Sequence, residues 1–247
     1  MCGRFVSARK RLELLAEFGV QRDSVTDEPA PDYNVAPTKQ IYAVRTDREG
    51  ERELRTVRWG LVPFWSKDPK AGARMINARA ETVAEKPAFR QAFAKRRCIL
   101  PADGYYEWKN KKPFYIFRTD GEALAMAGIY ELWRNKDVSE DHPEGWLWTA
   151  SVITTDATDD VGEIHDRMPM IIEPDLWADW LDPDNTEISQ LHAAMRPAMA
   201  GSVTSYPVST DVNFVRNNGP ELIRPLPTGG EDWSGHNHSP QAPGGDA

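Results

Sequence analysis

The chain has 247 residues, of which 40% are hydrophobic, and a formal net charge of −8. This length suits one large domain or two small ones that bury a proper core. No apolar run is long enough to span a bilayer, the first residues lack the apolar stretch of a signal peptide, and two cysteines do not make a disulfide framework. We therefore expect a cytoplasmic protein with no membrane partner.

The charge is distributed unevenly along the chain. Residues 1–120 hold 24 lysines and arginines against 16 acidic residues, whereas residues 121–247 hold 6 against 22. A basic half on an acidic chain is typical of a polyanion-binding face, and a solvated surface without a partner is the alternative.

The first segment, Met1-Cys2-Gly3-Arg4-Phe5, carries a pair of nucleophiles on one residue. A small second residue normally allows Met1 to be removed, which leaves Cys2 with a free α-amine beside its thiol. An amine condenses with an aldehyde to an imine, and an adjacent thiol can close on the imine carbon to give a thiazolidine. Cys2 is therefore a candidate for aldehyde capture, and the alternative is an unreactive cysteine near a frayed terminus.

The N-terminal half predicts a helix and a hairpin. Ser7 can cap a helix that runs to about Phe18, with Gly19 at its end. The next segments are a loop over 21–38 and two strands, 40–45 and 53–59, joined by a turn at 47–50.

Two stretches after the hairpin suggest a ligand-facing surface. Residues 60–65 place Phe64 and Trp65 beside a proline, which suits either a corner of the core or a platform on which bases stack. Further on, strand alternation sends Asn77 and Arg79 to one face.

The rest of the chain is rich in predicted strands, at 98–101, 104–109, 114–118, 123–133, 146–155, 171–172 and 203–208. Helical segments are expected at 87–97, 161–165, 174–181 and 186–195, with a capping segment at 213–223. The composition predicts one domain over 2–225 and a disordered Gly/Pro/Ser-rich tail over 226–247.

Capture of an aldehyde needs a group that moves protons, an acid, and a group that holds the nucleophile in register. Glu107 lies in an aromatic strand where burial would raise its pKa toward neutrality. His165 is the candidate acid, because histidine titrates near pH ~6.5. Asn77 offers a neutral amide for positioning. An exposed strand glutamate and a structural histidine are the alternatives for the first two.

Metal chemistry is not indicated. The chain has no CxxC pair, no HxxxH pair and no phosphate-binding glycine loop, so we expect neither a metal nor another cofactor.

Six short motifs follow one another along residues 2–225: Met1–Phe5, Tyr33–Thr38, Arg58–Pro63, Asn77–Thr82, Arg97–Trp108 and His165–Pro169. In this order they resemble the SOS-response-associated peptidase (SRAP) family. The resemblance implies an α+β fold, a single compact domain built on curved, mostly antiparallel, barrel-like β-sheet with peripheral helices.

The resemblance also implies a function, that of a sensor of abasic sites in single-stranded DNA. Cys2 would form a thiazolidine crosslink with the ring-opened deoxyribose, Asn77 would position it, Glu107 would handle the imine protons, and His165 would assist ring opening. The implied DNA contacts are Arg4, Asn34, Pro37, Trp59, Trp65, Arg79 and Trp108. The expected partner is single-stranded DNA with abasic sites, junctions with duplex included, and the expected state is a monomer. Weak strand-cleaving lyase activity and self-removal of the residues ahead of Cys2 are further expectations for such a protein.

Two other readings of the sequence stay open. In one, the Cys2 thiol attacks a carbonyl and its own amine is the base, as in an N-terminal-nucleophile peptidase or amidase. In the other, the basic half binds modified or single-stranded DNA without a covalent bond.

Overall fold

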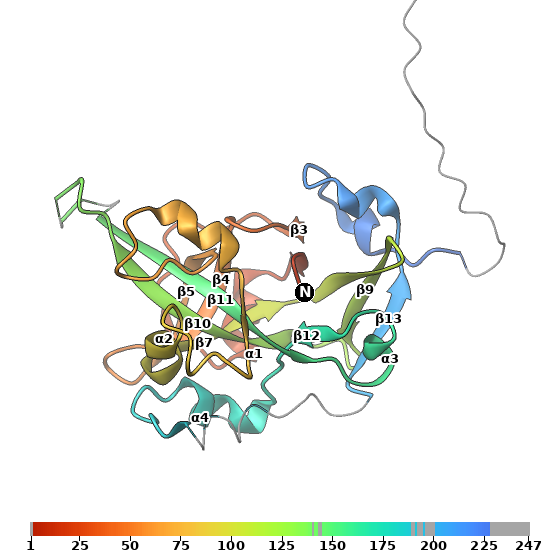
Figure 1. Ribbon diagram of the computed structural model, residues 1–247. Helices are drawn as coiled ribbons and strands as arrows, with labels where there is room; N and C mark the ends of the chain where they lie inside the picture. Colours follow the sequence, from red (N-terminus) through yellow and green to blue (C-terminus); the bar gives the residue numbers. More distant parts are fainter. Residues whose placement is uncertain are drawn as a thin grey trace, which may run out of the picture.

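The structure of the chain is a computed structural model that describes residues 2–139, 141–142, 145–188, 191, 195 and 201–227. It contains two β-sheets with short helices around them (Figure 1). The predicted α+β class, with its curved, mostly antiparallel sheet, is confirmed.

The large sheet has the strand order β12-β11-β10-β7-β4-β5-β2, and β6 pairs with β11. Strand β5 also pairs with β11 in parallel, which closes β5, β4, β7, β10 and β11 into a barrel. The strands are β2 (Arg22–Asp23), β4 (Gln40–Thr46), β5 (Arg52–Trp59), β6 (Asn77–Arg79), β7 (Arg97–Ala102), β10 (Leu124–Arg134), β11 (Trp146–Asp156) and β12 (Arg167–Pro169).

The small sheet has the order β13-β9-β8-β1-β3 and lies beside the barrel. Its strands are β1 (Phe5–Ser7), β3 (Asp32–Val35), β8 (Gly104–Lys109), β9 (Lys112–Arg118) and β13 (Val203–Pro207). One face of this sheet joins the core inside the barrel, and the other packs under residues 208–223.

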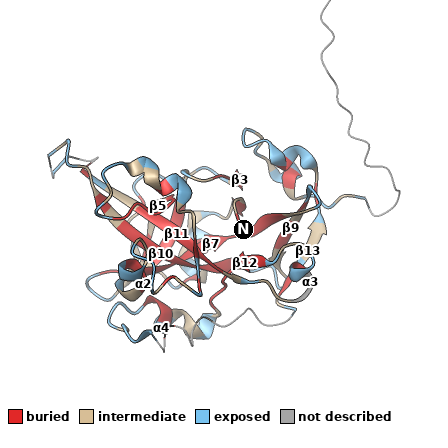
Figure 2. Cartoon of the chain, viewed as in Figure 1, coloured by how far each residue is buried: buried red, intermediate tan, exposed pale blue. Residues whose placement is uncertain are grey.

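The helices are short and peripheral. They are α1 (Arg11–Glu17), α2 (Arg90–Lys95), α3 (Asp159–Gly162) and α4 (Trp177–Leu181), with 3₁₀ turns η1 (Pro69–Arg74), η3 (Pro174–Leu176), η4 (Thr210–Asn213) and η5 (Pro220–Ile223). Buried residues run along the strands, while the helices and loops are largely exposed (Figure 2).

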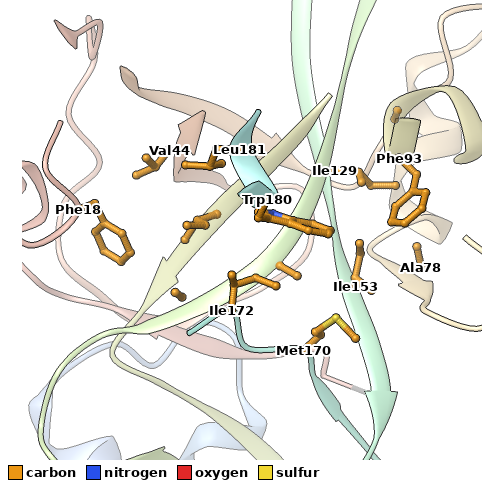
Figure 3. Packing of buried hydrophobic residues seen from close by; sticks show 14 of the residues in the cluster. Phe18, Val44, Ala78, Phe93, Ile129, Ile153, Met170, Ile172, Trp180 and Leu181 are labelled. Carbon is orange, nitrogen blue, oxygen red and sulfur yellow. The ribbon is translucent and has the colours of Figure 1, made fainter. Parts of the chain in front are cut away.

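Two apolar cores hold the sheets and helices together. Trp180 of α4 lies in the first, among side chains that include Phe93, Ile129 and Ile153 (Figure 3). Its indole N–H donates to Cys98 O at 2.9 Å, which satisfies the polar atom of a fully buried ring. The second core fills the barrel and extends to the small sheet.

Several predicted boundaries were wrong. Ser7 belongs to β1 rather than to a helix cap, because it pairs with Asp32, and α1 starts only at Arg11. Helix α1 ends at Glu17, and Gly19, the predicted stop, follows its C-cap Phe18 with a φ of +57°. The helix expected over 87–97 is confined to α2.

Further along the chain, the strand expected at 171–172 is a single bridge between Ile171 and Met126, and the ladder lies earlier, at β12. Most of the helix expected at 186–195 and almost all of the predicted tail lie outside the described residues.

Candidate active site around Cys2

Cys2 lies just before β1, with its side chain fully buried in the barrel core beside Phe5 and Trp59. Its thiol has a weak contact to Arg4 O at 3.8 Å. Burial raises the pKa of the Cys2 thiol well above its ordinary value, and the negative charge of Glu107 adds to the effect. The thiol is therefore protonated at neutral pH.

The side chain of Asn77 holds the main chain of Cys2. Its amide nitrogen donates to Cys2 O at 2.7 Å. Strand β6, which carries Asn77, is fixed by its parallel pairing with β11 and by a 3.0 Å bond from the Trp59 indole to Ile76 O. The predicted positioning amide is thus in direct contact with the predicted nucleophile.

Glu107 faces the same core from β8. Strand β1 pairs with β8 through Phe5 and Tyr105, and continuing this antiparallel register places Glu107 opposite Gly3. The Glu107 carboxyl is buried, and burial raises its pKa, an effect that the nearby His165 partly opposes. It is therefore a carboxyl close to both Cys2 and His165 that binds a proton more readily than an exposed glutamate.

His165 lies between α3 and β12, close enough to Glu107 for their charges to interact. Its Nδ1 is 2.9 Å from the backbone nitrogen of Arg167 and 2.9 Å from Asp166 Oδ1. The structure thus brings together Cys2, Asn77, Glu107 and His165, from four segments that are distant in sequence.

Part of the predicted DNA-contacting set is on the surface. Trp65 is 56% exposed and its neighbour Phe64 51% exposed, in the loop between β5 and η1. The loop is anchored at Gly60, where φ is +119° and a Cβ would lie 2.5 Å from Gly72 O. Arg79 is exposed at the end of β6. These residues present aromatic rings and a cation to solvent on a fixed backbone.

Other members of that set are not on the surface. The side chains of Asn34 and Trp59 are fully buried, so neither can contact DNA directly, and this part of the prediction is corrected. Arg4 is half-buried and donates to Asn34 Oδ1 at 2.7 Å and to Val212 O at 2.9 Å. Arg4 and Asn34 therefore join the start of the chain to the segment after β13.

Pro37 and Trp108 are both half-buried. Pro37 precedes Thr38, a turn residue with φ of +75°. Trp108 lies on the opposite face of β8 from Glu107, and its indole donates to Asn213 Oδ1 at 2.8 Å. The structure does not bring Trp108 to Cys2.

Tyr105 was missed by the sequence reasoning. It lies on the face of β8 that carries Glu107, its ring is fully buried beside Cys2, and its hydroxyl has no hydrogen-bond partner among the described residues. Its two-residue spacing from Glu107 was the available signal. No group of three His, Cys, Asp or Glu within the described ranges is placed to hold a metal ion, and no helix there is long and apolar enough to cross a membrane.

Residues 1–215 match the sequence profile of the SOS response associated peptidase (SRAP) family. The chain is 40% identical to the abasic site processing protein YoqW of Bacillus subtilis (strain 168), over 90% of this chain and 99% of that protein. It is 36% identical to the abasic site processing protein YedK of Escherichia coli (strain K12), over 92% and 100%. A crystal structure of a Bacteroides thetaiotaomicron protein superposes with a TM-score of 0.78 at 28% identity, covering 91% of this chain and all of that one.

Proposed function

The chain belongs to the SOS response associated peptidase (SRAP) family, and we propose that it captures abasic sites in single-stranded DNA as a covalent crosslink on Cys2. The names of its relatives, abasic site processing proteins, support the substrate. The observation that carries the proposal is the contact between Asn77 and the main chain of Cys2, in a site that also holds Glu107 and His165.

The proposed reaction begins with opening of the deoxyribose ring. Glu107 takes the proton of the C1′ hydroxyl, the C1′–O4′ bond breaks, and O4′ takes a proton from the imidazolium of His165, which leaves an aldehyde. The α-amine of Cys2 adds to C1′, and loss of one water gives an imine. The sulfur then adds to the same carbon while the thiol proton passes to the nitrogen, which completes the thiazolidine.

The environment of each group supports this order of events. The raised pKa of the Cys2 thiol keeps sulfur protonated and weakly nucleophilic, whereas an α-amine titrates near pH ~7.7–8.0, so the amine reacts first. Burial raises the pKa of Glu107, which suits a carboxyl that takes a proton and later returns it.

The proposal requires that Met1 be removed. Until then the nitrogen of Cys2 is an amide that cannot condense with an aldehyde, and Cys2 is 0% exposed. Removal of the residue ahead of it frees the amine.

Single-stranded DNA is the form of substrate that the surface supports. An abasic sugar must leave the line of the strand to reach a buried residue, which a single strand permits without distorting a stacked duplex. The exposed rings of Phe64 and Trp65 suit stacking on unpaired bases, and Arg79 suits a phosphate.

The experiment is to mix protein that lacks Met1, verified by intact mass, with single-stranded DNA that carries one abasic site. We expect a band on a denaturing gel that survives heating, with the mass of protein plus DNA minus one water. Cys2→Ala should abolish the band and Cys98→Ala, at the other buried cysteine, should leave it. A band of equal strength in Cys2→Ala would contradict the proposal.

The same preparation distinguishes the two other readings. Cleavage of peptides with no shifted band would indicate an N-terminal-nucleophile peptidase. A complex seen only on native gels, and falling steeply with salt, would indicate a reader that binds without a covalent bond.

A further inference from the structure

Arg167 of β12 is a buried arginine whose guanidinium joins three segments. Its side chain is 9% exposed. Nη1 and Nη2 donate to the two carboxylate oxygens of Glu81 at 2.7 and 3.0 Å, and Nη1 also lies 2.6 Å from Asp156 Oδ1. Nη2 donates to Thr154 O at 2.7 Å. A two-bond arginine–carboxylate pair fixes direction as well as distance.

The backbone alone holds these segments weakly. Strand β12 has three residues and ends at Pro169, which has no N–H to give to a ladder, and β6 also has only three residues. Both pair with the same part of β11, since Thr154 is aligned with Arg79 on one side and with Pro169 on the other. The guanidinium of Arg167 spans β11 and holds the two short strands together.

These strands lead to two groups of the candidate active site. Strand β6 starts at Asn77, which bonds to Cys2 O, and Glu81 follows β6 by two residues. Strand β12 starts directly after the loop that carries His165. The pair between Arg167 and Glu81 therefore joins the segment that carries the amide to the segment that carries the imidazole.

The backbone of Arg167 acts on His165 directly, because its N–H donates to Nδ1 at 2.9 Å. A ring nitrogen that accepts a bond carries no proton, so the neutral imidazole has its proton on Nε2. Asp166 Oδ1 lies 2.9 Å from the same Nδ1, and that contact is a hydrogen bond only when Nδ1 is protonated. Two groups, the Arg167 N–H and Asp166 Oδ1, therefore hold the ring at Nδ1 and fix its orientation.

We propose that Arg167 is a positioning residue for the reaction at Cys2, and this rests on the proposed function. Its side chain holds Asn77 and His165 at a fixed separation, and its N–H fixes the orientation of the His165 ring through Nδ1. Glu81 shares the task, because its hydrogen bonds to Arg167 lower the pKa of its carboxyl and keep it charged.

The first test is Arg167→Lys, which keeps the charge and removes the two-bond geometry. Crosslinking at saturating DNA should slow about 10- to 100-fold, the cost of misplaced groups. Affinity for single-stranded DNA with a tetrahydrofuran abasic analogue, which has no aldehyde, should not change. The matched control is Arg118→Lys, which alters another two-bond arginine–carboxylate pair, with Asp120, and should change neither quantity.

Glu81→Gln tests the same contact from the other side. The Glu81 side chain is 47% exposed, so this variant should fold even if Arg167→Lys does not. It should slow crosslinking, and in the Arg167→Lys background it should add little, because both changes remove one contact. Independent, additive effects of the two substitutions would overturn the proposal.

A measurement without DNA separates this proposal from the proposed function. The ring ¹⁵N shifts of His165 should show the Nε2–H tautomer in the wild type and in Arg118→Lys, and a mixture of tautomers in Arg167→Lys. If Arg167→Lys shows this mixture but the wild type forms no crosslink with abasic DNA, the positioning role of Arg167 stands and the proposed function is rejected. An unchanged tautomer together with an unchanged rate in Arg167→Lys would reject the positioning role.

Discussion

The amide nitrogen of Asn77 donates a 2.7 Å hydrogen bond to the carbonyl oxygen of Cys2, 75 residues earlier in the chain. This bond holds the main chain of the reacting residue and leaves its amine and thiol unengaged by Asn77. The geometry of the proposed reaction therefore depends on a residue that takes no part in the bonds made or broken.

We expect Asn77→Asp to slow crosslinking about 100-fold, because a carboxylate cannot donate to the Cys2 carbonyl and repels it. The rate at saturating abasic DNA is the measurement. Asn110→Asp, at an exposed turn between β8 and β9, is the control and should react as the wild type does. A normal rate in Asn77→Asp would remove Asn77 from the mechanism.

Glu107→Gln should slow crosslinking by about 10²- to 10⁴-fold, since an amide cannot exchange protons with the carbinolamine. Binding of the tetrahydrofuran analogue should be nearly unchanged. A variant that loses affinity and rate in equal measure would indicate that Glu107 binds DNA rather than moving protons.

The raised pKa of Glu107 also predicts how stability varies with pH. The unfolded chain ionises Glu107 at its ordinary pKa, whereas the folded chain does so only at a higher pH. The contribution of this group is complete below the ordinary pKa and is lost as pH rises to the folded value. Glu107→Gln should therefore melt above the wild type at pH 8 and match it near pH 4, as calorimetry can measure.

Trp65→Ala should weaken binding of single-stranded DNA by about 1–3 kcal/mol, the range measured for loss of one stacked base contact. The rate of crosslinking at saturating DNA should stay close to that of the wild type. Trp146→Ala is the matched control, because Trp146 is exposed on β11. Equal losses in the two variants would show that Trp65 is not a specific contact.

Arg79→Ala should lower affinity for all single strands alike and reduce the slope of log K against log salt by about 1, as expected for one lost phosphate contact. Titrations at several salt concentrations measure the slope. An unchanged slope would place Arg79 outside the DNA path.

Asn34→Ala should destabilise the protein by about 1–3 kcal/mol, because the buried Asn34 amide donates to Val212 O, Phe214 O and Asn217 O. Hydrogen exchange should speed up across 212–217 and stay slow in β10. Slow exchange across 212–217 in the variant would show that other contacts hold this segment.

The sequence was informative where structure is set locally. Alternation in 104–109 defined β8 to the residue, and the hairpin of β4 and β5 was predicted to within one residue at each end. The burial of Trp59 and Asn34 could not be read in the same way, because their partners lie 17 and about 180 residues further along the chain. Tryptophan and asparagine both suit a surface that binds DNA, and only tertiary contacts bury Trp59 and Asn34 in the core.

The candidate site shows the same limit. Glu107 and His165 were chosen by chemistry and by motif, but no spacing in the sequence brings them to Cys2. Their convergence depends on the pairing of β1 with β8 and of β6 and β12 with β11, which joins distant segments. The sequence did not indicate a role for Arg167, because its contacts to Glu81 and Thr154 join segments that only those strand pairings bring together.

The strands that bury Cys2 are synthesised long after it. Asn77 lies on β6, and β6 is held only once β11, which ends at Asp156, has been made. At about 5–20 residues per second, the ribosome takes roughly 8–30 s to travel from Cys2 to that point. During this interval the part of the fold that holds Asn77 against Cys2 is incomplete. On the proposed function, which requires removal of Met1, this interval is the time in which an aminopeptidase can act before Cys2 is buried.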